Sequence, residues 1–246
     1  MKKKFENTYG KTLKSILFAV NPLKKKVIKT YCTIHRFINL QAIEILKNEG
    51  NLEQYALYKS YVKKINEGVT WADQDFKSSN HFYHFSRGKG LYGFSDALSE
   101  CKKYYNKALA YLDVDDVGKA MFYFGAACHL IQDATVPQHV NNKLLKSHRQ
   151  FELWIISKFM SDYSFIVEKG ILRYSSLEEY IKNNALVANN TYLKYSNIKN
   201  RNERYEKIAT TILREAQKTT AGMMMDFYSV LKSYDNFDKI KNNSSK

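Results

Sequence analysis

The sequence predicts an all-α fold, organised as a single compact domain of several helices. Only two prolines and ten glycines occur in 246 residues. Apolar residues recur at helical spacing in several segments, whereas alternating strand patterns are few. Apolar side chains make up 44% of the chain and aromatic ones 14%. That composition can build a sizeable core, so global disorder is not expected.

Helices are expected in succession through most of the chain. An apolar stripe marks residues 27–48, and a second helix is expected over 52–66. Residues 67–93 are rich in Gly, Ser and Asn and are predicted to form one long irregular loop, which is usually functional in a compact domain. Further helices are expected over 96–112, from Asp113 as N-cap to about Val136 before Pro137, over 144–162, near 176–188 and over 203–232.

The patterned region, residues 27–234, is interpreted as the folded domain. Residues 1–26 are basic and weakly patterned and are interpreted as an N-terminal extension, and residues 235–246 as a polar, frayed tail. The apolar run at 16–20 is shorter than the ~7–15-residue core of a signal peptide. No run approaches the ~20 apolar residues of a membrane span, so we expect no transmembrane segment.

The net charge of +15 favours anionic partners, which include nucleic acid, anionic lipid and phosphorylated substrates. A Lys-rich solvated surface explains the same charge equally well, so charge alone does not choose a partner. The chain has three cysteines. Such an odd and sparse count predicts no disulfide framework. We expect Cys32, Cys101 and Cys128 to be core thiols.

Ligand-type residues concentrate in one stretch of the sequence. His129 and Asp133 are four residues apart, as are His148 and Glu152, so each pair shares one face of a helix. His139 lies between the two pairs, just past a helix break. For the first pair alone a hydrogen-bonded core pair is the better interpretation. The five residues together favour a Zn²⁺ site, because zinc takes imidazole nitrogen and carboxylate oxygen, and a zinc site points to hydrolysis.

Other residues of the same types lie upstream. His35 stands on an early predicted helix, and Asp73, Asp75, His81 and His84 lie in the predicted loop. Each of them alone is more typical of an ordinary surface, core or loop position than of a ligand.

The segment KAMFYFGAACHLIQDATVPQHV resembles the signature of the bacterial zinc-dependent phospholipases C, the alpha-toxin family. In that signature a Tyr–apolar–Gly helix leads to His-x₃-Asp, and a Pro stands two residues before a His. The resemblance continues in the family's order through CTIHRFINLQAIEIL, WADQDF with NHFYHF, SHRQFE and EAQKTTAGMMMDF. It runs from His35 to about Tyr228 and favours the single-domain members, since a C-terminal membrane-binding β-sandwich has no room here.

The resemblance implies a cluster of zinc ions in a surface cleft of the helical domain. It leaves His84 as a loop residue and implies two or three ions. The resemblance assigns the ligands to three ions. His139, His148 and Glu152 correspond to the ligands of one zinc, and Asp73, His81 and His129 to those of a second. Asp133 would bridge to a third zinc, which His35 would also bind.

Two departures from the family pattern bear on the site. In the family an N-terminal Trp also holds the third zinc, whereas the tryptophans here are Trp71 and Trp154, so the third ion is in doubt. Gln74 follows Asp73 where choline-preferring relatives have Tyr. An aromatic face there would attract a quaternary ammonium, so the headgroup preference stays open.

The resemblance implies hydrolysis of the phosphodiester bond of glycerophospholipids, giving diacylglycerol and a phosphorylated headgroup. Asp73 would also accept the proton of the attacking water. We expect a monomer that meets phospholipid at a membrane surface and does not bind nucleic acid. The family is typically exported, but this N-terminus is a poor export signal, so the location is left open between export and the cytoplasm.

Two alternatives remain. A zinc-dependent single-strand nuclease shares the core of the signature, but His148 and Glu152 follow His139 too closely for that class. The other alternative is a non-catalytic, zinc-stabilised domain that binds membranes. In that case the bound zinc should have no open coordination position.

Overall fold

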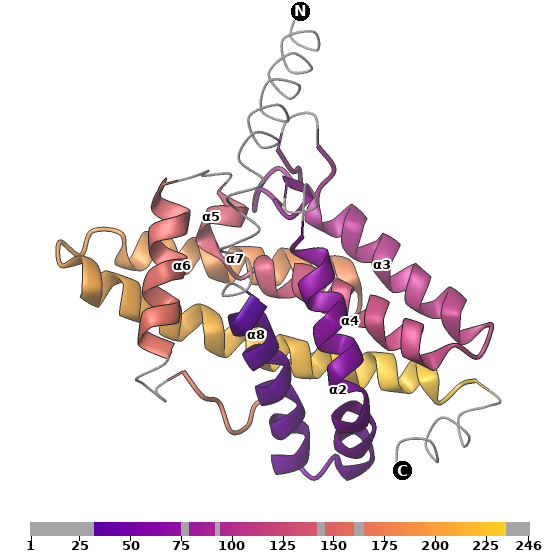
Figure 1. Cartoon of the computed structure of the whole chain (residues 1–246). Helices are drawn as coiled ribbons and strands as arrows, with labels where there is room; N and C mark the ends of the chain where they lie inside the picture. The colour runs from indigo at the N-terminus through magenta and orange to yellow at the C-terminus, as the bar shows by residue number, and fades with distance from the viewer. Residues whose placement is uncertain (1–31, 75–78, 92–93, 142–145, 160–164, 235–246) are drawn as a thin grey trace, which may run out of the picture.

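The computed structural model describes residues 32–74, 79–91, 94–141, 146–159 and 165–234, without the side chains of 146–149 and 159. Within these ranges every regular element is a helix, which confirms the all-α prediction (Figure 1). The predicted extension at 1–26 and the tail at 235–246 lie outside the described residues. The helices are one over 32–48, α2 (Leu52–Ala72), α3 (Ala97–Leu112), α4 (Val117–Asp133), α5 (Pro137–Val140), α6 (Lys146–Phe159), α7 (Leu177–Tyr195) and α8 (Arg201–Leu231).

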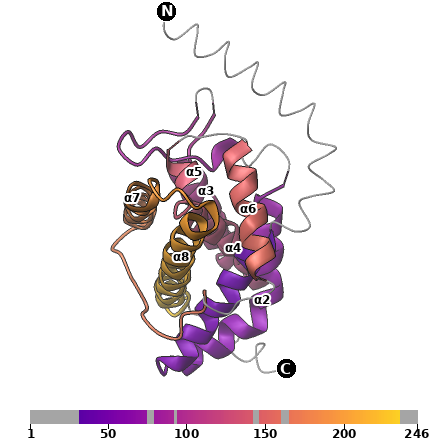
Figure 2. The same cartoon turned by 90° about the vertical axis from the view of Figure 1, so that its left-hand side faces the viewer.

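Helix α4 lies at the centre of the molecule. Most of its residues are buried, including the whole stretch from Phe124 to Asp133, as expected of a helix that is apolar on every side. Helices α2 and α3 make the most extensive contacts with α4. The long α8 runs across the molecule with α7 beside it (Figures 1 and 2). Among the described helices, none combines the length and apolar character needed to cross a membrane.

Two glycines let α2 and α4 pack backbone against backbone. A Cβ atom on Gly68 would collide with the carbonyl oxygen of Phe122, and one on Gly125 with the carbonyl oxygen of Ile65. The prediction that the irregular loop begins at residue 67 is therefore wrong, since α2 continues to Ala72. Glycine serves here to allow a close helix crossing and does not end the helix.

The start of α4 also differs from the prediction. Asp113 was expected to be its N-cap, but its backbone N–H bonds to the carbonyl of Leu109 and closes α3. Asp115 then adopts a left-handed φ of 57°, and the side chain of Asp116 accepts from the N–H of Lys119 as the N-cap. The helix ends at Asp133, three residues before the expected boundary at Val136.

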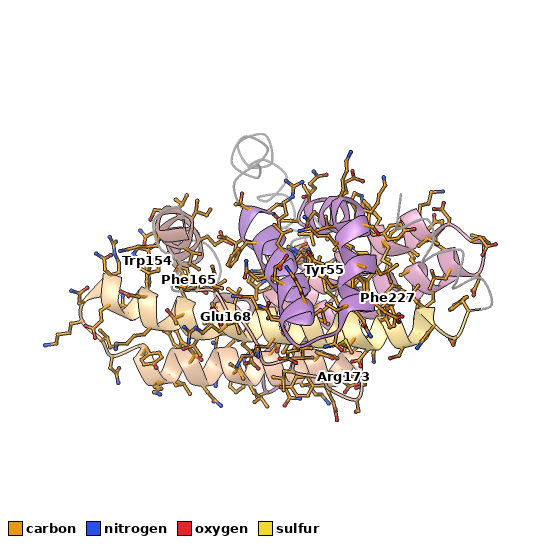
Figure 3. All side chains as sticks on the ribbon, turned by 90° about the horizontal axis from the view of Figure 1, so that it is seen from below. Tyr55, Trp154, Phe165, Glu168, Arg173 and Phe227 are labelled. Atoms are coloured by element: carbon orange, nitrogen blue, oxygen red, sulfur yellow. The ribbon has the colours of Figure 1, made fainter. Side chains whose placement is uncertain are left out.

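The core has two clusters along α8. In the larger one the rings of Phe124 and Phe227 stack with centroids 4.2 Å apart. In the smaller one Phe151 of α6 packs edge-on against Tyr205. Figure 3 shows Trp154 and Phe165 near one end of α8 and Phe227 toward the other. The cysteines are all buried and free, as predicted.

Candidate metal centre

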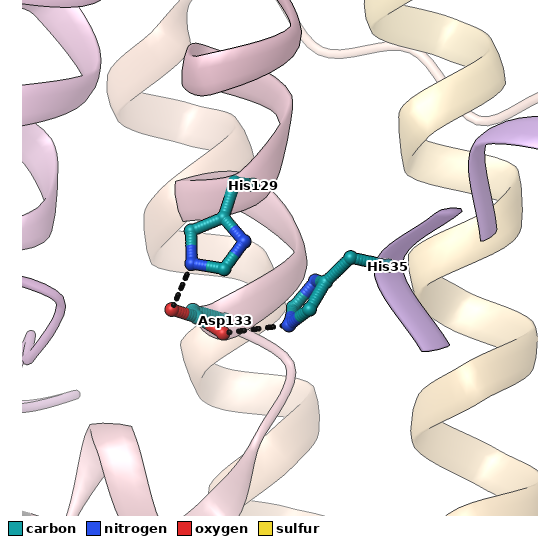
Figure 4. A group of neighbouring side chains, drawn as sticks. All are labelled: His35, His129 and Asp133. Carbon is teal, nitrogen blue, oxygen red and sulfur yellow. Dashed lines mark ion pairs between the residues drawn. The ribbon is translucent and has the colours of Figure 1, made fainter. Parts of the chain in front are cut away.

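Asp133, the last residue of α4, is the hub of the candidate site. It is 4% exposed. Its Oδ2 lies 2.8 Å from Nδ1 of His81 and 3.1 Å from Nε2 of His129. Its Oδ1 lies 3.4 Å from Nε2 of His35 (Figure 4). A buried carboxylate without partners costs several kcal/mol, so the three imidazoles account for its burial.

Four separate segments deliver the imidazoles. His129 lies one turn before Asp133 on α4, and His35 comes from the helix over 32–48. His81 follows α2 in the irregular segment, and His139 belongs to the short α5. The ring of His129 is central, with its centroid 4.2 Å from that of His35 and 4.8 Å from that of His81. Residues far apart in the sequence thus meet at the C-terminal end of α4.

Two overlapping groups of side chains in the described residues can each hold a metal ion. One group is His35, His129 and Asp133, and the other is Asp73, His81 and His129; within each group the ligand atoms lie within 4.8 Å of one another. Nε2 of His81 and Nδ1 of His129 are buried and have no hydrogen-bond partner there. Imidazole and carboxylate are the donors that zinc prefers. The residues therefore fit zinc, and the shared His129 makes the two groups neighbours.

The electrostatics of the cluster favour its metal-binding forms. Burial alone would raise the pKa of Asp133, but its interactions with the neighbouring imidazoles hold that pKa well below its usual value. Burial lowers the pKa of His35 and that of His139. Neutral imidazoles and an ionised carboxylate are the states that bind divalent metals.

The set predicted for a further zinc is only partly described. His139 is 6% exposed, its Nδ1 lies 3.3 Å from the carbonyl oxygen of His81, and its ring stacks on Phe82. Glu152 lies on α6 and is partly exposed, and neither metal-binding group of the described residues includes it. The side chain of His148 lies outside the description. The role of these three residues as one ligand set stays a prediction.

The members of the two groups differ in their exposure. Asp73 is partly exposed at the C-terminal end of α2, as is His35 on its helix, whereas His81, His129 and Asp133 are buried. Asp75, from the predicted loop, lies outside the described residues.

The remaining loop histidine is His84. It is partly exposed and lies 3.2 Å from the hydroxyl of Ser86. Neither metal-binding group of the described residues includes it, and its interpretation as a loop residue that binds no metal stays a prediction.

Sequence reasoning missed two neighbours of the predicted ligands. Sγ of Cys32 lies 3.6 Å from Oδ2 of Asp73, and Oε1 of Gln132 lies 2.9 Å from Nδ1 of His35. The sequence offers only a weak indication for Cys32, which lies about one helical turn before the candidate ligand His35. The signal for Gln132 was stronger, because an amide in the apolar stretch before Asp133 needs a buried polar partner.

Comparison with known proteins decides the family. The family model described as zinc dependent phospholipase C matches residues 34–221. The chain belongs to the zinc-dependent phospholipase C family. A phospholipase C of Clostridium novyi is 27% identical to it over 237 residues, covering 80% of this chain and 59% of the relative. Family membership agrees with Zn²⁺ as the metal.

Solved structures share the fold. The alpha-toxin of an avian strain of Clostridium perfringens superposes with a TM-score of 0.68 at 19% identity, over 82% of this chain and 65% of the toxin. The alpha-toxin of Clostridium absonum gives 0.69 at 20% identity, over 83% and 65%. This zinc-dependent phospholipase C family member thus spans 59–65% of the length of these three relatives.

Proposed function

We propose that the protein hydrolyses the phosphodiester bond of glycerophospholipids in a zinc-dependent reaction, giving diacylglycerol and a phosphorylated headgroup. One observation carries the proposal: a buried, ionised Asp133 surrounded by imidazoles from four segments. The family whose model matches the chain supplies the substrate class. We propose further that the protein acts as a monomer at a membrane surface.

The described residues that would hold the metal are His35, Asp73, His81, His129 and Asp133. Bound zinc would supply Lewis acidity and a hydroxide near neutral pH, since it lowers the pKa of its water to about 7. The protein contributes a preorganised set of donors, and burial lowers the pKa of His35 among them, which favours the neutral imidazole that binds a metal. Asp133 contributes a negative charge that offsets part of the charge of the bound cations.

Asp73 is the residue we assign to proton transfer. It is partly exposed at the end of α2, whereas Asp133 is buried among imidazoles. In the hydrolysis, the bond from phosphorus to the water oxygen forms and the bond from phosphorus to the glycerol oxygen breaks. The proton of the attacking water passes to the Asp73 carboxylate, and the diacylglycerol oxygen takes a proton from solvent water as it leaves.

Turnover of micellar phosphatidylcholine tests the proposal. Release of phosphocholine should cease when a chelator removes the metal and return when Zn²⁺ is added. Asp73→Asn should lose activity by about 10²–10⁴-fold, the usual contribution of a positioned general base, while its far-UV circular dichroism stays that of the wild type. Hydrolysis that survives chelation would contradict the proposal.

Parallel assays separate the alternatives. Single-stranded DNA cleaved in preference to phospholipid would identify a nuclease. Zinc bound without hydrolysis of either substrate would identify a non-catalytic zinc-stabilised domain.

A further inference from the structure

A glutamine amide lies directly behind one of the candidate ligands. Gln132 is 1% exposed and stands between His129 and Asp133 on α4. Its Oε1 lies 2.9 Å from Nδ1 of His35. This contact joins α4 to the helix over 32–48, on the side of the His35 ring away from Asp133.

The other end of the same amide is also bonded. Nε2 of Gln132 donates to Oδ1 of Asn39 at 2.8 Å and to Oγ1 of Thr220 at 3.2 Å. Asn39 and Thr220 are fully buried. Asn39 lies one turn after His35, and its own Nδ2 donates to Oδ1 of Asn66 at 3.0 Å. Three helices therefore fix the orientation of the Gln132 amide.

This orientation sets the protonation pattern of the His35 ring. Both hydrogens of the Gln132 amide nitrogen are used, so the atom that faces Nδ1 of His35 is an acceptor. Nδ1 must then carry the proton and donate it. In the neutral ring Nε2 is left as a bare lone pair, and that atom lies 3.4 Å from Oδ1 of Asp133. Two acceptors so close repel each other unless a cation lies between them.

We propose that Gln132 is a positioning residue for the metal centre. By accepting from Nδ1, it holds His35 in the tautomer whose Nε2 binds a divalent cation together with Asp133. The inference rests on the proposed function, which it deepens by assigning a residue behind the ligands. Hydrogen-bond partners behind metal-bound histidines fix the ring in this way, and their loss typically weakens metal affinity by about 10–100-fold.

The chain offers a matched control. Gln217 is also a fully buried glutamine, but among the described residues the partners of its amide are backbone groups, at Phe165, Val167 and Leu213. Gln217→Leu should therefore cost stability as Gln132→Leu does, without changing the metal centre. Gln132→Glu keeps an acceptor facing Nδ1 of His35 and serves as the conservative variant.

The experiment measures tautomer and affinity together. Long-range ¹H–¹⁵N NMR of the metal-free protein reports which nitrogen of His35 is protonated, with the signal assigned by its loss in His35→Asn. Competition with a chromogenic chelator gives the zinc affinity. We expect protonated Nδ1 in the wild type and in Gln132→Glu. For Gln132→Leu we expect loss of that tautomer and a zinc affinity weaker by about 10–100-fold, and for Gln217→Leu neither change.

Several results would overturn the inference. A proton on Nε2 of wild-type His35 would mean that the amide chain runs the other way, and this measurement decides the matter even if Gln132→Leu cannot be purified. Equal zinc affinity in Gln132→Leu and Gln217→Leu would overturn the inference alone, with the proposed function intact. A wild-type protein that takes up no zinc would overturn both.

Discussion

Asp133→Asn tests the centre most sharply among single substitutions. Asparagine keeps the shape of the side chain but removes its charge. Two of the contacts to Oδ2 are short, 2.8 Å from His81 and 3.1 Å from His129. A hydrogen bond to a charged group contributes about 1.5–3 kcal/mol. The amide oxygen of asparagine can still accept both bonds at the ~0.5–1.5 kcal/mol of a neutral pair, so the metal-free variant should lose only the difference. That loss is about 2–3 kcal/mol out of the ~5–15 kcal/mol unfolding free energy of a typical domain.

Zinc adds a second and more specific effect. A ligand that binds only the folded state contributes about 4 kcal/mol at a free concentration about 1,000 times its Kd. The wild type should gain stability of this order in urea titrations with zinc, and Asp133→Asn should lose most of the gain. Asp226→Asn is the control, because Asp226 bonds Arg173 and Tyr180 instead of the cluster. A zinc-dependent gain in Asp133→Asn equal to that of the control would refute the reasoning.

Three further predictions concern the fold and its ionisable groups. Gly125→Ala should lower the unfolding free energy measured in urea by about 1–3 kcal/mol or more, because α2 and α4 touch at this position. Gly118→Ala is the control, since a methyl group has space there, and it should not lower the unfolding free energy. Equal losses in the two variants would contradict the packing argument. The metal-free protein should lose unfolding free energy as the pH falls below 6.5, the ordinary pKa of histidine. The reason is that the unfolded chain then binds protons that folded His35 and His139 do not bind. An unfolding free energy that does not change with pH below 6.5 would contradict this prediction. Burial raises the pKa of Cys101 to about 12, so a thiol reagent should label it only after denaturation.

The sequence was sufficient for most helices because their patterns are local. The helix expected over 96–112 is observed as α3, Ala97–Leu112, with Asp96 accepting from the N–H of Ser99. A helix break before Pro137 was predicted from the ring and its missing N–H. The break is observed, but α4 already ends at Asp133, and Pro137 is the first residue of α5. These features depend on a few neighbouring residues, which a single sequence displays.

The errors arose where tertiary packing decides. Gly68 resembled a loop residue, but it lies at a helix crossing whose partner, Phe122, is remote in the sequence. Asp113, Asp115 and Asp116 are all plausible caps, and the observed choice depends on the left-handed turn at Asp115. Neither fact can be obtained from local propensity.

In the candidate site, too, local features could be predicted from the sequence and tertiary contacts could not. The spacing of His129 and Asp133 placed them on one helical face, where the structure has them. The convergence of His35, Asp73 and His81 on that face was implied only by the family resemblance, since three separate segments deliver them. The contact between Gln132 and His35 depends on polar side chains from three helices, which no motif in the sequence marks.

Native mass spectrometry with metal analysis tests the central claim most directly, namely that these imidazoles and carboxylates bind zinc. The wild-type protein should carry two or three zinc ions per chain. His129→Ala should lose zinc from both groups, because His129 is common to them. A folded wild-type protein that stays free of metal in excess zinc, or a His129→Ala variant with undiminished zinc content, would contradict the account.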